Sequence, residues 1–231
     1  MVLSNPNSPL SNPAWHALGD RQSGFNIGTD TLRYFPEDLS PFVGMQHWNE
    51  AECRELSDNL PGGRLFFVML EPKVVIPDNF RIKVTMPLYQ MVCDEPRPMS
   101  LSERIRPLTE ADVPQMLALT ALTRPGPFAT RTIEFGNYVG IFEDERLIAM
   151  GGERLKVPGH TEVSAICTHP DHQGRQLGTR ILHHVSKNIH DRGETPFLHT
   201  KTDNTPALKV YEKLGYRISR DIHFAIIVRK H

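Results

Sequence analysis

The feature that most constrains the fold is a polar, glycine-bearing turn that joins an apolar strand to an amphipathic helix within residues 163–182. The helix is predicted over residues 177–190, because apolar side chains recur along it with helical spacing. The start of a helix leaves backbone N–H groups without partners, and the helix dipole adds partial positive charge there. We therefore expect an anion or a phosphate group to bind at this turn.

Two glycines and two arginines in this segment favour an anion site. Gly174 and Gly178 allow the backbone to approach a ligand, because no Cβ stands in the way. Arg175 and Arg180 can donate charge-assisted hydrogen bonds. The glycine spacing matches neither a P-loop nor the GxGxxG fingerprint, which excludes those two nucleotide sites. A plain connection between strand and helix, with solvated polar side chains, is the alternative.

A second segment, residues 200–216, lies about 30 residues further on and reads TKTDNTPALKVYEKLGY. Together, the turn and this segment resemble the GNAT superfamily of acyl-CoA N-acyltransferases, over residues 103–230. The family element N-x-x-A-x-x-x-Y-E-K-L-G-[FY] is matched by Asn204, Ala207 and Tyr211 and by the EKLGY that follows. The chain is similar to the bacterial subgroup in which a degenerate N-terminal part precedes one catalytic GNAT domain.

The family signature at the phosphate turn, [RQ]-x-x-G-x-[GA], is matched less completely. Gln173 and Gly178 occupy its first and last positions. Gln176 replaces the central glycine, at a point where the backbone of family members approaches the pyrophosphate. This departure affects one backbone approach and leaves the rest of the predicted site in place.

The resemblance implies an α/β fold with a mixed, mostly antiparallel GNAT-type sheet flanked by helices. We expect this domain over residues 99–231, preceded by a smaller α+β domain over residues 1–98. The boundary is placed within residues 94–102, where two prolines, charges and serines separate two ordered patterns. Residues 1–47 have no sustained apolar period and are predicted to be irregular. Their spaced aromatic side chains predict that they pack against a folded surface; these are Trp15, Phe25, Tyr34, Phe35 and Phe42.

The remaining elements follow from apolar periodicity and from the positions of proline and glycine. The pattern over residues 80–93 is a strand that Pro87 interrupts. Helices are predicted over residues 49–60, 109–123, 177–190 and 205–214, and strands over 64–70, 80–93, 103–106, 137–143, 146–155, 162–168, 197–202, 216–218 and 224–228.

For the coenzyme, the resemblance implies acetyl-CoA as co-substrate. Family members open two neighbouring strands, so that main-chain groups of one strand pair with pantetheine. In this chain those groups would belong to Ile166, Cys167 and Thr168. The other implied contacts lie in the phosphate turn and the following helix, at Gln173, Gly174, Arg175, Gln176, Leu177, Gly178, Thr179, Asn204, Ala207 and Tyr211.

For the chemistry, the resemblance implies direct attack of an amine on the thioester. Such a reaction needs an acid to protonate the departing thiolate and a base to deprotonate the ammonium. Tyr211 is the implied acid, and a core tyrosine is its alternative. Glu162 is the implied base, with Glu153 or water as competitors. Cys167 is interpreted as a packing thiol, since the family uses no covalent intermediate.

The predicted function is therefore acetyl-CoA-dependent transfer of an acetyl group to a primary amine of a small molecule or a peptide. A non-catalytic acyl-CoA-binding module is the alternative, and a scaffold that binds no coenzyme is a third possibility. The acceptor itself is not predicted, although residues 120–136, with Arg124 and Arg131, are expected to line its site.

Composition narrows the partners and the compartment. The net charge of −1 combines 8 basic and 12 acidic side chains in residues 1–100 with 18 and 15 in residues 101–231. This balance argues against a nucleic-acid binder, and the short apolar runs argue against a membrane span. We expect a cytoplasmic monomer or homodimer without a metal. The three cysteines and the histidines in and after the turn form no metal-binding pattern; they are Cys53, Cys93, Cys167, His169, His172, His183 and His184.

Overall fold

The computed structural model describes residues 8–59, 62–71, 76, 78–99 and 104–230. Eight strands form one mixed, mostly antiparallel sheet in the order β3-β10-β4-β9-β8-β7-β6-β5, and β1 and β2 form a separate ribbon. The predicted α/β fold class is confirmed. The strands are β1 (Leu32–Tyr34), β2 (Val43–Met45), β3 (Leu65–Leu70), β4 (Phe80–Val92), β5 (Ile105–Pro107), β6 (Val139–Glu143), β7 (Arg146–Val157), β8 (His160–Thr168), β9 (Thr195–Lys201) and β10 (Arg217–Arg229).

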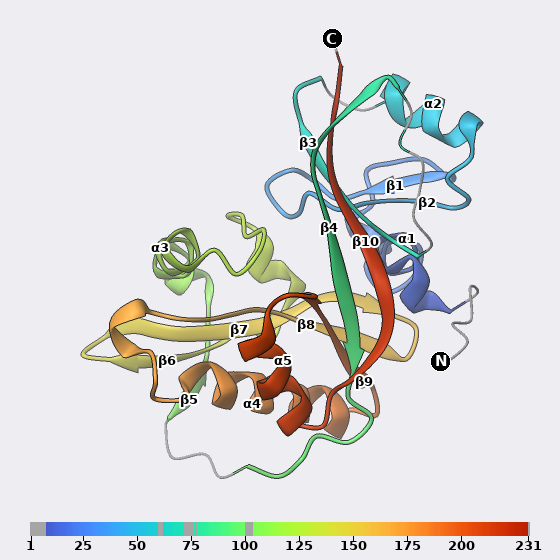
Figure 1. Cartoon of the computed structure of the whole chain (residues 1–231). Coiled ribbons are helices and arrows are strands. Elements are labelled where there is room, and N and C mark those ends of the chain that lie inside the picture. The colour runs from blue at the N-terminus through green and yellow to red at the C-terminus, as the bar shows by residue number, and fades with distance from the viewer. Residues whose placement is uncertain (1–7, 60–61, 72–75, 77, 100–103, 231) are drawn as a thin grey trace.

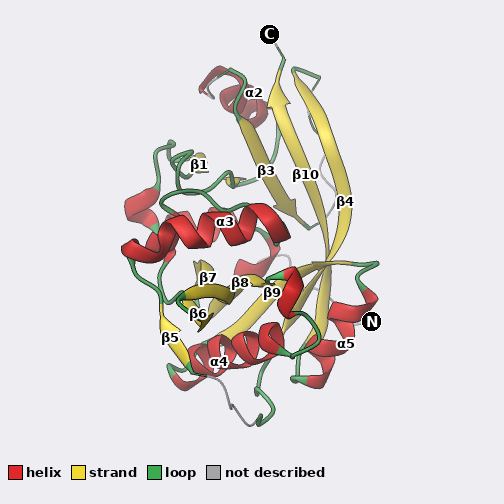
Figure 2. Ribbon diagram, turned by 90° about the vertical axis from the view of Figure 1, so that its left-hand side faces the viewer, coloured by secondary structure: helices red, strands yellow, loops and turns green. Residues whose placement is uncertain are grey.

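The α-helices are α1 (Pro13–Gly19), α2 (Glu50–Asn59), α3 (Val113–Thr123), α4 (Leu177–Asp191) and α5 (Thr205–Lys213). In Figures 1 and 2, α4 and α5 lie on one face of the lower part of the sheet and α3 lies on the other. The long strands β4 and β10 rise from this body towards β3 and α2. No helix among the described residues is long and apolar enough to cross a membrane.

Two hydrophobic clusters cover the two faces of the lower sheet. The α4 face is apolar as predicted, and its side chains pack with strand residues such as Ile148 and Leu198. The opposite cluster contains Met116 and Leu119 of α3 together with Leu18 of α1. Because each helix buries one apolar stripe, the sheet is held between two layers, and the N-terminal segment helps to build the layer that contains α3.

Strand β4 lies between β9 and β10, although it comes from the first 98 residues. It pairs with β10 along its whole length and with β9 only from Leu88 to Val92. Pro87 lies just before the segment of β4 that pairs with β9, so its missing N–H disrupts no hydrogen bond to β9. One sheet thus contains strands from both sides of the predicted boundary in residues 94–102, and that boundary remains a prediction.

The prediction that residues 1–47 are irregular is wrong. The described part of this segment, residues 8–47, forms α1 and the β1–β2 ribbon, together with two short 3-10 turns. The expected packing of this segment is confirmed, because four of its five aromatic side chains are buried and Phe25 packs against a core cluster. The helix escapes a periodicity search because it has only seven residues and is bounded by Pro13 and Gly19.

The prediction of two closing strands is also wrong, since residues 217–229 form the single strand β10. The pairing of β10 with β4 shifts register between Ile218 and Arg220, and again between Ile226 and Ile227. Such bulges bend a strand without ending it, so the strand continues through the polar residues 219–221 that separate the two apolar patterns. The remaining predicted helices and strands are present, with ends displaced by a few residues.

Candidate functional site

The predicted anion-binding turn has the geometry of an open helix start. Gly174 has φ of 79° and Gln176 has φ of 60°, so both lie in the left-handed region, and α4 begins at the next residue. Gln173 to Gln176 are exposed to solvent. The amide groups at the start of α4 are therefore accessible, and the 15-residue helix provides a full dipole behind them.

Gly178 brings α4 close to the neighbouring strand. A Cβ at this position would lie 3.2 Å from Oγ1 of Thr168 in β8. The glycine therefore allows the helix to approach the end of β8, so that the turn and the strand border the same space.

The basic side chain beside the turn is held by an acidic partner. Arg175 donates to Glu143 at 2.9 Å, and His172 lies 3.2 Å from the same carboxylate. This pair is exposed, so it holds the arginine only weakly, and an anion in the turn could compete for it.

The sheet opens next to this turn. Strands β8 and β9 are its parallel pair, and they pair only from His160 to Glu162 of β8. Ala165 has φ of 56°, and the register between β7 and β8 shifts on either side of Gly152. The bulge in β8 and the divergence of β9 leave the β9-facing backbone of residues 163–168 without a strand partner. This opening is the one that the resemblance predicts at Ile166, Cys167 and Thr168.

Tyr211 lies at the opening, on helix α5. Its hydroxyl faces the side chain of Thr200 in β9, and burial, which outweighs the opposing effect of Thr200, raises the pKa of the phenol above its ordinary value. Asn204 caps α5, since its side-chain oxygen accepts from the backbone N–H of Ala207 at 3.4 Å. The second motif thus positions a protonated hydroxyl beside β9, one of the two splayed strands.

Glu162 is fully buried at the last position of β8 that pairs with β9. Arg154 donates to both of its carboxylate oxygens, at 2.8 and 2.6 Å, and His199 Nδ1 lies 2.6 Å from Oε1. Burial by itself would raise the pKa of Glu162, but the charge and hydrogen bonds of Arg154, with the His199 contact, lower it to about 2. The carboxylate is therefore ionised and fully engaged.

His199 continues the network to the N-terminal segment. Gln90 Nε2 lies 3.0 Å from His199 Nε2 and also donates to the carbonyl of Leu10 at 2.9 Å. These contacts fit an imidazole that accepts at Nε2 and donates from Nδ1 to Glu162. Sequence reasoning missed both His199 and Arg154. A predicted hairpin with Arg154 and Glu162 on opposite sides of its turn was the available signal for the ion pair.

Glu153, the competing base, is also buried and paired. Its carboxylate accepts from Arg192 at 2.6 Å and from Asn137 at 2.9 Å, and Lys156 lies 3.0 Å away. Cys167 is buried as well, and desolvation raises the pKa of its thiol to about 11. A thiol that keeps its proton at neutral pH is a poor nucleophile.

The predicted residues fall into two groups. Gly178 brings the start of α4 against Thr168 at the end of β8, and Tyr211 of α5 faces Thr200, beyond the last residue of β9 that pairs with β8. The carboxylates of Glu153 and Glu162, by contrast, are enclosed in ion pairs. Among the described residues, no group of three or more His, Cys, Asp and Glu side chains is arranged to hold a metal ion.

Comparisons with known proteins agree with this geometry. The family model described as FR47-like protein matches residues 138–225. The chain is 34% identical to a GNAT-family protein of Novosphingobium aromaticivorans, with a TM-score of 0.91 over 97% of this chain and 100% of that one. It also has the fold of a GCN5-related N-acetyltransferase from Kribbella flavida, with 14% identity and a TM-score of 0.62 over 94% and 96% of the two chains.

A curated relative matches a shorter stretch. This is the catalytic subunit of the N-terminal acetyltransferase B complex of Arabidopsis thaliana, which is 29% identical over 103 residues. The match covers 41% of this chain and 59% of that subunit. The sheet that opens beside a helix start thus defines a protein of the acetyltransferase fold. The chain belongs to the GNAT family of acetyltransferases.

Proposed function

We propose that the protein is an acetyl-CoA-dependent N-acetyltransferase that transfers the acetyl group directly to a primary amine of a small molecule or a peptide. The observation that carries this proposal is the opening between β8 and β9, bordered by the helix start of α4 and by Tyr211. Family membership implies acetyl-CoA as the co-substrate, and the opening offers backbone groups and an anion site that fit it.

In this proposal, residues 173–179 bind the pyrophosphate with backbone amides at the start of α4. Residues 166–168 pair with the pantetheine arm as a neighbouring strand would. A backbone N–H of β8 then donates to the thioester carbonyl oxygen, where negative charge grows as the amine attacks. Asn204 and Ala207 contribute the other wall, at the start of α5.

Tyr211 acts as the general acid. Burial raises the pKa of its hydroxyl, so the group carries its proton at neutral pH and can donate it to the thiolate that leaves. The hydroxyl faces Thr200 of β9, and the half-buried side chain leaves it accessible to the reaction.

The proton acceptor for the amine remains to be assigned among Glu162, Glu153 and water. A carboxylate with a pKa of about 2 has little tendency to take a proton, and both carboxylates already accept from cations. These contacts favour water over Glu162 and Glu153 in that role. Because these contacts leave neither carboxylate free to act as a base, they also support the alternative, a non-catalytic acyl-CoA-binding module.

Calorimetry with acetyl-CoA, followed by a thiol-release assay on a panel of amines, tests the proposal. We expect binding, and turnover with at least one class of amine. Tyr211→Phe should lower kcat by about 100-fold and leave the Kd for acetyl-CoA unchanged. Tyr34→Phe, which removes a hydroxyl in the N-terminal ribbon, is the matched control and should leave both unchanged.

Each failure has its own meaning. Binding without turnover on a panel of polyamines, amino acids and peptides would favour the binding module. No binding of acetyl-CoA would contradict both readings and leave a scaffold. Equal turnover by the wild type and Tyr211→Phe would remove the tyrosine from the mechanism.

A further inference from the structure

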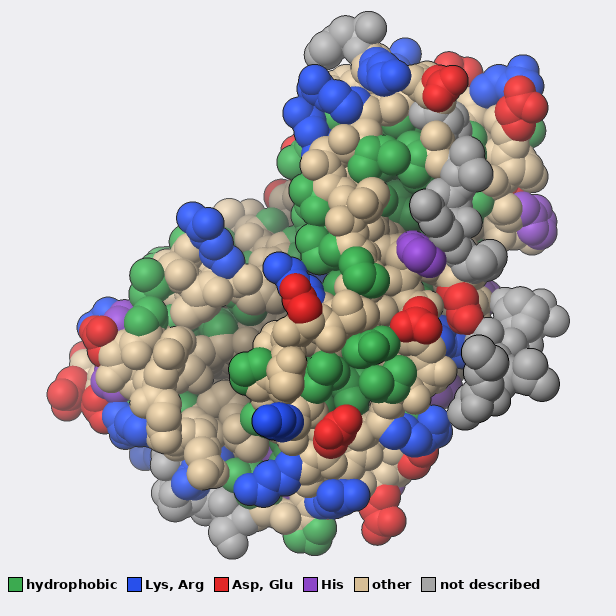
Figure 3. Space-filling view, in the orientation of Figure 1, with side chains coloured by type: hydrophobic (Ala, Val, Ile, Leu, Met, Phe, Trp, Pro, Cys, Tyr) green, Lys and Arg blue, Asp and Glu red, His purple; other side chains and the backbone are tan. Residues whose placement is uncertain are grey.

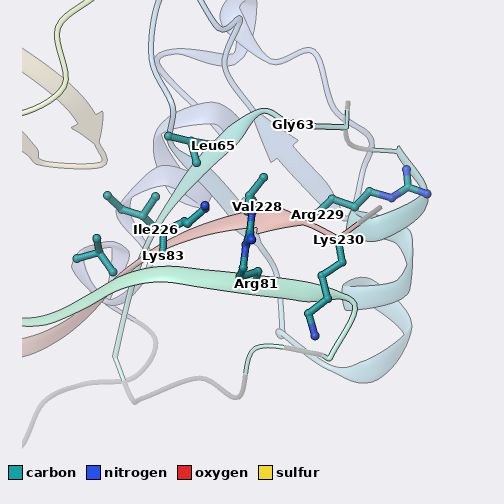
Figure 4. A pocket seen from close by; sticks show the side chains of 9 residues that line it. Gly63, Leu65, Arg81, Lys83, Ile226, Val228, Arg229 and Lys230 are labelled. Atoms are coloured by element: carbon teal, nitrogen blue, oxygen red, sulfur yellow. The ribbon is translucent and has the colours of Figure 1, made fainter.

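A groove in the described part of the chain lies away from the opening, on the upper part of the sheet. It has a volume of about 890 Å³, and its lining comes from β3, β4, β10 and the residues that follow β10. Figure 4 shows it from close by, with apolar side chains from the strands and long basic side chains around them. The lining residues are Gly63, Leu65, Arg81, Lys83, Val84, Ile226, Val228, Arg229 and Lys230.

All charged side chains that line the groove are basic. They are Arg81 and Lys83 of β4, Arg229 of β10, and Lys230. Within the described part of the chain, Arg81, Lys83 and Lys230 make no ion pair with an acidic side chain. Several like charges around a low-dielectric floor produce a positive potential, which favours an anionic occupant.

The floor of the groove is apolar and open to solvent. Leu65 is 45% exposed and Val84 is 37% exposed, whereas large apolar side chains in this fold are mostly buried. Figure 3 shows hydrophobic side chains grouped over this upper part of the molecule. An open sheet face of this kind can contact an extended peptide along its length, whereas a small molecule binds in a more enclosed cavity.

Protection of a free strand edge accounts for only part of this arrangement. Strand β4 has no β9 partner before Leu88, and lysine, proline and a bulge commonly protect such edges. Lys83 at the bulge fits that role. Arg229 and Lys230 do not, because β10 lies between β3 and β4 and is not an edge strand. Edge protection also does not require the exposed apolar floor.

The groove lies on the face of the sheet opposite α4 and α5. Strand residues alternate between faces, so Leu65 lies on the same face as Phe67 and Met69, and Ile226 on the same face as Phe224. Phe67, Met69 and Phe224 pack in the cluster that contains α1 and α3. The proposed coenzyme site is built from α4 and α5 on the other face of the sheet. An acceptor amine that meets the thioester therefore approaches it from the face that carries the groove.

The distance between the opening and the groove follows from strand geometry. Tyr89 of β4 pairs with Thr200, whose side chain contacts the hydroxyl of Tyr211. Lys83 and Arg81 lie six and eight residues further along β4, which corresponds to about 20 to 26 Å at about 3.3 Å per residue. An extended peptide covers this distance in about six to eight residues.

We propose that this basic groove binds an acidic stretch of a polypeptide acceptor, located about six to eight residues from the amine that is acetylated. The inference rests on the proposed function and specifies the class of acceptor: a peptide or protein with carboxylates at that distance. The apolar floor contacts the side chains between the carboxylates, and Arg81, Lys83 and Lys230 contact the carboxylates themselves.

Three fluorescent peptides of equal length, each with a free N-terminal amine, test the groove by anisotropy. One carries Asp and Glu at positions 7–9, one carries them at positions 2–4, and one has Asn and Gln at positions 7–9. The wild type should bind the first peptide most tightly, and added salt should weaken that binding. The double variant Arg81→Ser, Lys83→Ser should weaken it about tenfold, equal to about 1.4 kcal/mol, and leave the amide peptide unchanged.

Lys187→Ser is the matched control, since it removes an exposed charge on α4, remote from the groove. It should leave binding of all three peptides unchanged. Equal binding of the three peptides by the wild type, or unchanged binding by the double variant, would overturn the proposal. So would tighter binding of anionic vesicles or of single-stranded RNA than of the first peptide.

Binding and turnover separate the two proposals. If the first peptide binds preferentially and no peptide or small amine is acetylated, the proposed function fails and the groove stands. If peptides are acetylated without any preference for distal carboxylates, the groove fails and the function stands.

Discussion

Replacement of Arg154 by methionine tests whether its buried ion pair with Glu162 holds strands β7 and β8 together. The side chain of Glu162 is fully buried, and Arg154 supplies two of its hydrogen bonds. Removal of the arginine leaves an ionised carboxylate without its main partner, a change that typically costs about 3–5 kcal/mol. For a domain stable by about 5–15 kcal/mol, this loss is large.

Urea unfolding at pH 7, followed by tryptophan fluorescence, measures this cost. We expect Arg154→Met to lose about 3 kcal/mol in the free energy of unfolding. The double variant Arg154→Met, Glu162→Leu should recover much of it, because it replaces the pair by apolar groups. A single variant within 1 kcal/mol of the wild type, or a double variant as unstable as the single, would refute the reasoning.

The same ion pair predicts how the stability of the wild type and of Arg154→Met changes with pH. In the wild type the folded pKa of Glu162 lies below the unfolded value, so its contribution is complete above about pH 4.5 and is lost as the pH falls towards 2. In Arg154→Met, burial dominates and raises the folded pKa above the unfolded value. The variant then becomes more stable relative to the wild type as the pH falls below 5, and a constant difference would contradict the assignment.

Two further predictions concern the motif residues. Gln176→Gly should raise the melting temperature slightly and stabilise the protein by up to about 1 kcal/mol, because the backbone there is left-handed; a lower melting temperature would show that the side chain makes a compensating contact. Asn204→Ala should cost about 1 kcal/mol in urea unfolding through loss of the α5 cap, while Asn204→Ser retains most of the stability; equal losses in both variants would exclude capping as the cause.

The elements that the sequence predicts well are those whose pattern is long and local. Helix α4 has five apolar side chains on one face over 15 residues, and the β6–β7–β8 meander has turn residues at both of its bends. Helix α1 has no such pattern. Its stability comes from the burial of Ala14, Ala17 and Leu18 against distant strands, which no window of seven residues can reveal.

The candidate site divides in the same way. The turn at residues 173–178 and the cap at Asn204 depend on neighbouring residues, so a motif places them. The partners of Glu162 come from three different strands: Arg154 from β7, His199 from β9 and, through His199, Gln90 from β4. Their meeting depends on strand order, and the insertion of β4 next to β9 is encoded in long-range packing that local patterns do not contain.

The position of β4 also has a consequence for the time at which the fold can be completed. Residues 80–92 leave the ribosome early, but they pair with residues 197–201 and 217–229, which are the last strands to be made. Pairings between such distant segments close large loops, so they form slowly. During synthesis β3 and β4 therefore stay unpaired until β10 has been made. Interrupted translation would release a chain in which these strand edges are exposed and prone to aggregation.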